Sequence, residues 1–196
     1  LADESRRRNG VYMSPENRGN SWMCAAAEAD LEEQLAVLRA RFRTSRTIIA
    51  GGSMGGAAAL IYASHHPDTV DGVVALCPAT DMRELHRDMS SREELIFRHL
   101  ARSIEVAYGG TPEQVPEEYA YRSPVCQVSR LTMPVVVRHG DADPILSPEH
   151  PRRLVAALRA QGTPVIYDEI PGGDHDAPTV RTPWRRYLDF VLSPAP

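Results

Sequence analysis

The sequence contains no lysine: all 22 of its basic residues are arginine. This absence excludes Schiff-base chemistry and a serine–lysine catalytic pair, since both need a lysine side chain. It also excludes the lysine-dependent phosphate loop of nucleotide-binding proteins. The arginines are scattered apart from residues 6–8, and the formal net charge is −4. The chain therefore has no basic surface pattern for nucleic acid, and we predict no nucleic-acid partner.

Long hydrophobic runs are also absent. No stretch approaches the roughly 18 to 20 apolar residues that cross a bilayer, and residues 1–9 lack the apolar core of a signal peptide. We therefore predict no membrane association and a cytoplasmic protein. The three cysteines, Cys24, Cys77 and Cys126, are an odd number without a C-x-x-C pair, which predicts reduced thiols in the core in place of a disulfide framework.

Metal and cofactor motifs are lacking as well. None of the seven histidines belongs to an H-E-x-x-H motif or another metal-ligand spacing. The glycine cluster at 51–56 does not have the G-x-G-x-x-G spacing of a dinucleotide-binding loop. We therefore predict no metal ion and no cofactor.

What the sequence does contain is an alternation of apolar strands and amphipathic helices. Near-continuous valine and isoleucine runs predict strands buried on both faces, and apolar residues at helical spacing predict the helices between them. The predicted strands are 10–14, 47–50, 72–77, 134–138 and 165–170, and the predicted helices are 28–43, 57–66, 152–161 and a C-terminal helix containing Trp184, Tyr187, Leu188 and Val191. This order predicts an α/β fold with a doubly wound, mostly parallel sheet.

One long segment interrupts the alternation. Residues 81–130 contain helical stretches, most clearly 92–108, and no strand signal. We predict a single domain over 1–196, with a core of 1–80 and 131–196 and a lid-like insertion at 81–130. The alternative to a lid is that the helices of this insertion have only a structural role.

A glycine-flanked serine follows the strand predicted at 47–50. The segment Gly51-Gly-Ser-Met-Gly55 fits G-x-S-x-G between a strand and a helix, where such a serine sits on a strained turn. Glycine suits the flanking positions, Gly51 and Gly55, because the strand and the helix pass close together. Ser53 is therefore a candidate nucleophile, and a plain strand-to-helix turn is the alternative.

An activated serine needs a base and an acid that orients the base. Two later strands run into the loops Arg138-His-Gly-Asp-Ala-Asp-Pro144 and Pro171-Gly-Gly-Asp-His-Asp-Ala177. Parallel strands bring both loops to the sheet edge that carries Ser53. His175 is the predicted base, because it follows two glycines in a loop.

The acid has three candidates. Asp143 is favoured because it directly precedes Pro144 at the outer part of its turn. Asp141 is closer to the strand end, where it is better placed to brace the loop, and Asp81 is the outside candidate. Asp174 and Asp176, which flank His175, are interpreted as further loop braces.

The other histidines have structural interpretations. His65 and His66 end a predicted helix, so we expect them to cap it or to meet solvent. His139 opens the acid loop and is expected to pack or to hydrogen-bond within the turn. His150 lies at the start of a helix.

Together these motifs resemble the α/β-hydrolase superfamily, most closely its dienelactone-hydrolase and prolyl-oligopeptidase-like serine esterases and peptidases. The resemblance spans nearly the whole chain and rests on residues 51–56, 139–144 and 172–175, and more weakly on 17–19 and 121–124. It implies that Ser53 is the nucleophile, Asp143 the acid and His175 the base, and that the backbone N–H of Met54 donates to the oxyanion.

One part of the family pattern is missing. Family members begin with further strands and with a loop that supplies a second oxyanion donor, and nothing in residues 1–9 resembles that loop. Loss of one donor typically costs about 10² to 10³ in turnover. The missing donor loop and a first residue other than methionine together favour the interpretation that this sequence is part of a longer enzyme, whose N-terminal segment supplies the donor. The alternative is that another group of this chain acts as the second oxyanion donor.

The predicted function is hydrolysis of a carboxylic ester or thioester of a small molecule through an acyl-enzyme. Peptide hydrolysis of the prolyl-oligopeptidase type is an alternative, and a non-catalytic binding protein on the same fold is another. The identity of the substrate and the oligomeric state stay open, with a homo-oligomer as one option.

Overall fold

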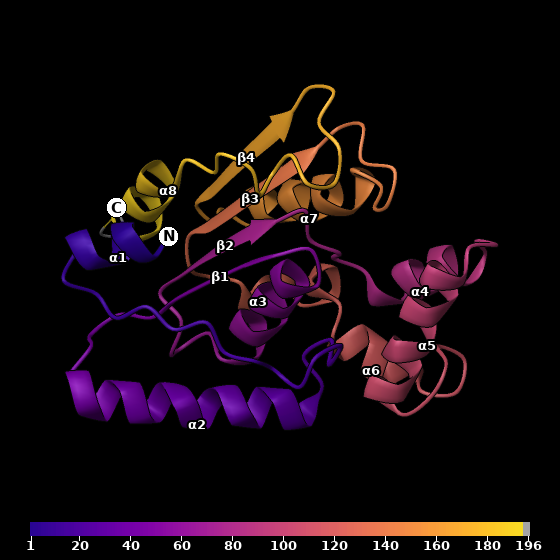
Figure 1. Ribbon diagram of the computed structural model, residues 1–196, viewed down its shortest axis with the longest axis horizontal. Helices are drawn as coiled ribbons and strands as arrows, with labels where there is room; N and C mark the ends of the chain where they lie inside the picture. The colour runs from indigo at the N-terminus through magenta and orange to yellow at the C-terminus, as the bar shows by residue number, and fades with distance from the viewer. Residues whose placement is uncertain (194–196) are drawn as a thin grey trace.

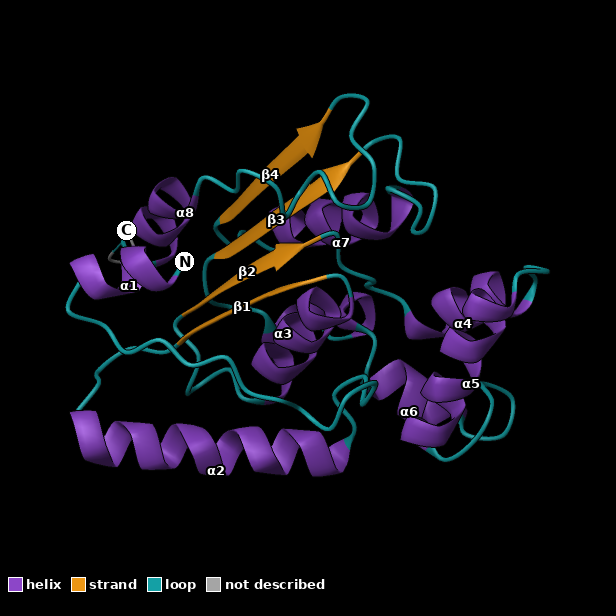
Figure 2. Ribbon diagram, in the orientation of Figure 1, coloured by secondary structure: helices purple, strands orange, loops and turns teal. Residues whose placement is uncertain are grey.

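The computed structural model describes residues 1–193 and is built on a parallel sheet (Figure 2). Four strands of the described residues pair in the order in which they occur in the chain: β1 (Ile48–Gly52), β2 (Gly72–Leu76), β3 (Val135–Gly140) and β4 (Val165–Ile170). Every pair is parallel. The carboxyl ends of all four strands therefore lie at one edge of the sheet, where ligand sites of open α/β sheets form.

Helices cover both faces of this sheet (Figure 1). Along β2 and β3 alternate valines point to opposite sides, as the period of two in a strand requires. One side packs with α3 (Met54–His65) and α7 (Glu149–Ala160), and the other with α8 (Trp184–Val191). The predicted doubly wound α/β architecture is confirmed, and the predicted helices 57–66 and 152–161 are present with slightly earlier starts.

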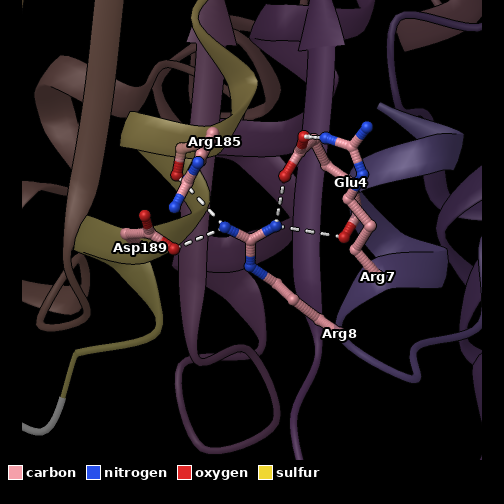
Figure 3. A pocket seen from close by; sticks show the side chains of 5 residues that line it. All are labelled: Glu4, Arg7, Arg8, Arg185 and Asp189. Atoms are coloured by element: carbon pink, nitrogen blue, oxygen red, sulfur yellow. Dashed lines mark hydrogen bonds and ion pairs between the residues drawn. The ribbon is translucent and has the colours of Figure 1, made fainter.

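The first helices of the chain lie at the outside of the fold. α2 (Ala25–Phe42) fits the helix predicted at 28–43 and packs its buried Leu31 and Leu35 into the larger core. α1 (Ala2–Arg7) had no sequence prediction. Figure 3 shows how it is attached: Arg8 bridges Glu4, at 2.5 Å, and Asp189 of α8. This ion-pair cluster joins the beginning of the chain to its last helix.

The predicted strand at 10–14 is absent from the structure. A strand needs the backbone of a neighbouring strand to pair with, and residues 10–14 pair with none in the described chain. Val11 and Tyr12 are 39 % and 48 % exposed, so little burial would compensate for ordering them. The segment follows an irregular path, and together with α2 and β1 it lines a groove. β1 is consequently an edge strand, because residues 1–193 contain no strand before it.

The insertion between β2 and β3 is helical, as predicted. It consists of α4 (Met82–Ser90), α5 (Leu95–Tyr108), α6 (Pro116–Tyr121) and two 3₁₀ turns, Pro124–Cys126 and Val128–Arg130. In Figure 1 these helices lie on the side to which the strands point. The insertion is therefore adjacent to the carboxyl edge of the sheet.

A buried charged cluster attaches the insertion to the core. The Glu28 carboxylate of α2 pairs with His65 and His66 of α3, at 2.9 Å each, and with Arg122 of the insertion at 3.2 Å. The second ring nitrogen of His65 lies 3.0 Å from the carbonyl oxygen of Tyr121. The expectation that His65 caps its helix or meets solvent is wrong: its side chain is 2 % exposed, because the cluster around Glu28 encloses it.

The three cysteines are free, as the sequence predicted, but they do not share one environment. Cys77 is buried, Cys24 is half-buried and Cys126 is exposed. Burial raises the pKa of the Cys77 thiol to about 11, so this group stays protonated at neutral pH. The prediction that all three thiols lie in the core is wrong for Cys126, which sits in a short turn of the insertion.

Candidate active site

Three loops meet at the carboxyl edge of the sheet. Ser53 follows β1, Asp143 follows β3, and His175 follows β4. The strands end in register, with Gly52 beside Leu76 of β2 and Gly140 beside Ile170 of β4. Loops that leave aligned strand ends begin at the same height, which is why side chains distant in sequence converge here.

Ser53 occupies a strained turn between β1 and α3. Its φ of 52° and ψ of −118° are unfavourable for a residue with a side chain. The Ser53 amide donates to the Leu76 carbonyl oxygen at 2.8 Å, which holds the turn against β2. The hydroxyl is thereby presented at the exposed end of the helix.

The glycines of this turn differ in how much space a side chain would have. A Cβ on Gly51 would lie 2.3 Å from the Gly55 carbonyl oxygen, and one on Gly56 would lie 2.8 Å from that of Leu76. A Cβ on Gly55 would meet nothing within 4 Å. The expectation that close approach requires glycine at both Gly51 and Gly55 is therefore wrong for Gly55. The backbone of Gly55 crowds Gly51, and Gly56 is the second position without room.

The structure brings the three predicted side chains into one hydrogen-bonded chain. The Ser53 hydroxyl lies 2.9 Å from Nε2 of His175, and Nδ1 of His175 lies 2.7 Å from Oδ2 of Asp143. Because a carboxylate only accepts, Nδ1 carries the proton and Nε2 is free to accept from the hydroxyl. This is the geometry of a serine activated by an oriented base. Asp81, the outside candidate, instead caps α4 by accepting from the Glu84 amide.

The Asp143 carboxylate is fully buried and fully hydrogen-bonded. Oδ1 accepts from the backbone amides of Ile145, at 2.8 Å, and Leu146, at 3.0 Å. Burial raises the pKa of the Asp143 carboxyl, but the hydrogen bonds from two histidines and these two amides outweigh burial. The pKa of Asp143 therefore lies well below its usual range, and the group is charged at neutral pH.

His139 hydrogen-bonds within its turn, as expected, and its partner there is the Asp143 carboxylate. Its Nε2 lies 3.1 Å from Oδ2 of Asp143 and 3.1 Å from the Leu146 carbonyl oxygen. Both oxygens accept, so Nε2 carries the ring proton. Its side chain is 0 % exposed. The position of His139 at the opening of the acid loop predicted a contact within the turn, but the spacing of His139 and Asp143 does not by itself identify the partner.

The acid and base loops are fixed to each other. The Gly172 amide donates to the Asp141 carboxylate at 2.6 Å, and the Ala142 amide donates to the Gly173 carbonyl oxygen at 3.0 Å. A Cβ on Gly140 would lie 2.1 Å from that same carbonyl oxygen. Asp141 thus braces the loop and does not contact His175 among the hydrogen bonds of the described residues.

Two further groups lie next to the three loops. The Met54 amide is the first of α3, and amides of a first helical turn have no acceptor inside the helix. It lies at the positive end of the helix dipole, beside Ser53.

The second group is Arg92 of the insertion. Its guanidinium donates to the Pro144 and Ile145 carbonyl oxygens at 2.8 and 3.3 Å. The insertion therefore contacts the loop that carries Asp143.

A doubly wound parallel sheet with serine, aspartate and histidine, in that order, on loops at the carboxyl ends of its strands is the arrangement of the α/β-hydrolase superfamily. Within this superfamily the chain belongs to the prolyl oligopeptidase family, whose family model matches residues 8–192. The Peptidase_S9 match thus includes all three loops of the site.

Similar proteins agree with this assignment. The uncharacterized peptidase YtmA of Bacillus subtilis (strain 168) is 39 % identical over 66 residues, which are 34 % of this chain and 26 % of that protein. A puromycin-hydrolyzing peptidase of Mycobacterium tuberculosis superposes with a TM-score of 0.70 at 19 % identity, over 89 % of this chain and 26 % of that one. A truncated carbohydrate esterase from gut microbiota gives a TM-score of 0.67 at 19 % identity, over 85 % and 66 %. The matched residues cover about a quarter of each of the two peptidases.

None of the helices in residues 1–193 has both the length and the apolar character that a membrane span needs.

Proposed function

We propose that this chain carries the catalytic centre of a serine hydrolase, with Ser53 as nucleophile, His175 as general base and Asp143 as the orienting acid. One observation carries the proposal: the continuous contact from the Ser53 hydroxyl through His175 to Asp143, at 2.9 and 2.7 Å. Membership of the prolyl oligopeptidase family supports it.

The proposed reaction has two acyl-transfer steps. Ser53 Oγ forms a bond to the substrate carbonyl carbon while its proton passes to Nε2 of His175, and the protonated imidazole then gives that proton to the leaving group. Water attacks the acyl-enzyme with His175 again as base, which releases the acid and regenerates Ser53. The Met54 amide donates to the oxyanion in both steps.

A small-molecule ester is the substrate class we favour. Ser53 is exposed in the turn between β1 and α3, so a small ester can reach its hydroxyl. The similarity in fold to a carbohydrate esterase supports this choice.

Peptide or other amide cleavage is the second candidate. It is favoured by the family itself and by the relatives named as peptidases. The two candidates share the Ser53 chemistry and differ in the leaving group, so substrates and not mutants of the triad separate them.

An active-site probe tests the shared chemistry. We expect a fluorophosphonate to label the protein in stoichiometric amount, and Ser53→Ala to abolish labelling. Ser147→Ala, a change of an exposed serine in the acid loop, is the matched control and should label like the wild type. Absence of labelling, or labelling that survives Ser53→Ala, would favour a non-catalytic binding protein.

A substrate panel tests the finer choice. p-Nitrophenyl esters of increasing acyl length are compared with aminoacyl p-nitroanilides at equal concentration. We expect turnover of the esters with a higher kcat/KM. Faster cleavage of the anilides would establish the peptidase alternative and leave the triad assignment intact.

A further inference from the structure

A second cluster of polar side chains lies outside the Ser53 site, between the insertion and the core. Glu84 and Asp88 are four residues apart on α4, so they face the same side of that helix. His150 belongs to the first turn of α7. One ligand-type atom from each of the three residues lies within 4.8 Å of the others, and Nε2 of His150 is 3.7 Å from Oε2 of Glu84.

The His150 imidazole is buried without a hydrogen bond. Its side chain is 1 % exposed, and neither ring nitrogen has a hydrogen-bond partner in the described part of the chain. The His150 carbonyl oxygen, in contrast, accepts from the Thr80 hydroxyl at 2.7 Å, which fixes this turn of the backbone. A buried polar group without a partner costs free energy. Its Nε2 points to the carboxylate of Glu84, so a ligand between them would satisfy it.

We propose that Glu84, Asp88 and His150 form a site for one divalent transition-metal cation, for which Zn²⁺ is the probe. One imidazole and two carboxylates, with water in the remaining position, are a ligand set that Zn²⁺ accepts. The site would join α4 of the insertion to α7, the helix that follows the Asp143 loop. It is distinct from the Ser53 centre, and it does not depend on the proposed hydrolase activity.

Two arginines neutralise the carboxylates when no metal is bound. Arg153 forms an ion pair with Oε2 of Glu84, and Arg87 lies 3.5 Å from Oε1 of Glu84 and 3.4 Å from Oδ1 of Asp88. Their side chains are 45 % and 71 % exposed. Exposed ion pairs contribute little to stability, so both guanidinium groups can move into solvent when the cation takes their place. The cation and the arginines therefore compete for the same two carboxylates.

This competition makes opposite predictions for two substitutions. Asp88→Asn removes a ligand at a partly exposed position, and we expect it to weaken Zn²⁺ binding about tenfold or more. Arg153→Gln removes the competing cation, and we expect it to tighten Zn²⁺ binding. Asp68→Asn, a change of an exposed acid outside the cluster, is the matched control and should bind like the wild type.

The experiment uses the whole chain after removal of metal with a chelator. Zn²⁺ is titrated by isothermal calorimetry, and the midpoint of thermal unfolding is measured with and without it. We expect one equivalent bound and a higher unfolding midpoint, with the order Arg153→Gln, wild type, Asp88→Asn in affinity. Glu84→Gln is a second ligand variant on α4, and we expect it to lower the affinity as Asp88→Asn does.

His175 of the Ser53 centre is another histidine that could bind the probe. We expect His175→Ala to keep the bound equivalent and the shift in unfolding midpoint. Equal affinity of Asp88→Asn, Glu84→Gln and the wild type, loss of the bound equivalent in His175→Ala, or no bound equivalent at all would overturn the proposal.

Discussion

At the scale of single residues, the main choice in the site is between two aspartates of one short loop. Asp143 and Asp141 are separated by one residue, but their carboxylates have different partners. Asp143 is buried against His175 and His139, whereas Asp141 is exposed and accepts from the Gly172 amide. Only the first can stabilise a positive charge that develops on the base.

Asparagine substitutions separate these two aspartates. Asp143→Asn should lower kcat by about 10³ to 10⁴, because the amide no longer stabilises the imidazolium and favours the wrong tautomer. Asp141→Asn keeps an oxygen that can accept from Gly172, so its kcat should fall by less than about tenfold. Steady-state kinetics on the best ester of the panel measure both. Similar losses in the two variants would reassign the acid.

His139 is expected to act as a positioning residue. Its Nε2–H donates to the carboxylate oxygen that His175 also uses, and so limits the rotation of Asp143. His139→Phe should lower kcat by about tenfold with little change in KM, whereas His139→Gln, which keeps a donor, should recover part of the loss. A loss of thermal stability without any difference in kcat between the two variants would leave His139 a core residue only.

At the scale of elements, the turn from β1 to α3 depends on which glycines are crowded. Gly51→Ala would place a methyl group 2.3 Å from the Gly55 carbonyl oxygen. Because that atom belongs to the backbone, the strand and the helix must separate. We expect a loss of about 2 kcal/mol or more in the free energy of unfolding, together with loss of probe labelling at Ser53.

Gly55→Ala is the matched substitution in the same turn. The added methyl group meets nothing within 4 Å, and alanine is the better helix former. The free energy of unfolding should stay within about 1 kcal/mol of the wild type or increase. Chemical denaturation of the two variants compares them directly. Equal destabilisation by both would show that the interpretation of this turn is wrong.

The segment at 10–14 shows why apolar sequence alone does not make a strand. Its apolar residues have strand propensity, but a strand forms only where another backbone offers hydrogen bonds. The predictions at 72–77 and 165–170 succeeded because these segments lie next to other strands. Sequence pattern therefore identified every strand that has a partner in the described chain and over-predicted the one that has none.

At the scale of the whole molecule, the cluster around Glu28 links α2, α3 and the insertion. Burial raises the pKa of Glu28, but His65, Arg122 and His66 outweigh burial and lower this pKa to about 2. A lowered pKa means that the charged form contributes stability above the unfolded value, near 4.5, and that this contribution is lost as the pH falls toward 2. The magnitude is about 3 kcal/mol for a group this buried.

The pH dependence of unfolding tests this linkage. We expect the stability of the wild type to fall between pH 4.5 and 2, and Glu28→Gln to reduce the slope in that window. The same substitution should lower stability at pH 6, because buried Arg122 then keeps Glu118 as a carboxylate partner but loses Glu28. Glu33→Gln, at an exposed position of the same helix, is the control and should keep the wild-type slope. An unchanged slope in Glu28→Gln would exclude this cluster as its source.

The sequence by itself determined the alternation of strands and helices, the helical insertion, and the family that residues 51–56, 139–144 and 172–175 indicate. These features are readable because periodicity and turn residues are local, and because parallel strands send their carboxyl ends to one edge. It also proposed Ser53, Asp143 and His175, whose contact the structure then provided.

Only the tertiary structure decided which side chains share a partner. Three contacts of this kind join residues from different elements. Asp143 is shared by His139 and His175, His65 is buried beside Glu28, and His150 lies near Glu84. Their distances depend on how helices pack on the sheet, and no local pattern encodes that packing. The same physics separates Gly51 from Gly55, since what a Cβ would meet is set by the neighbouring backbone in space.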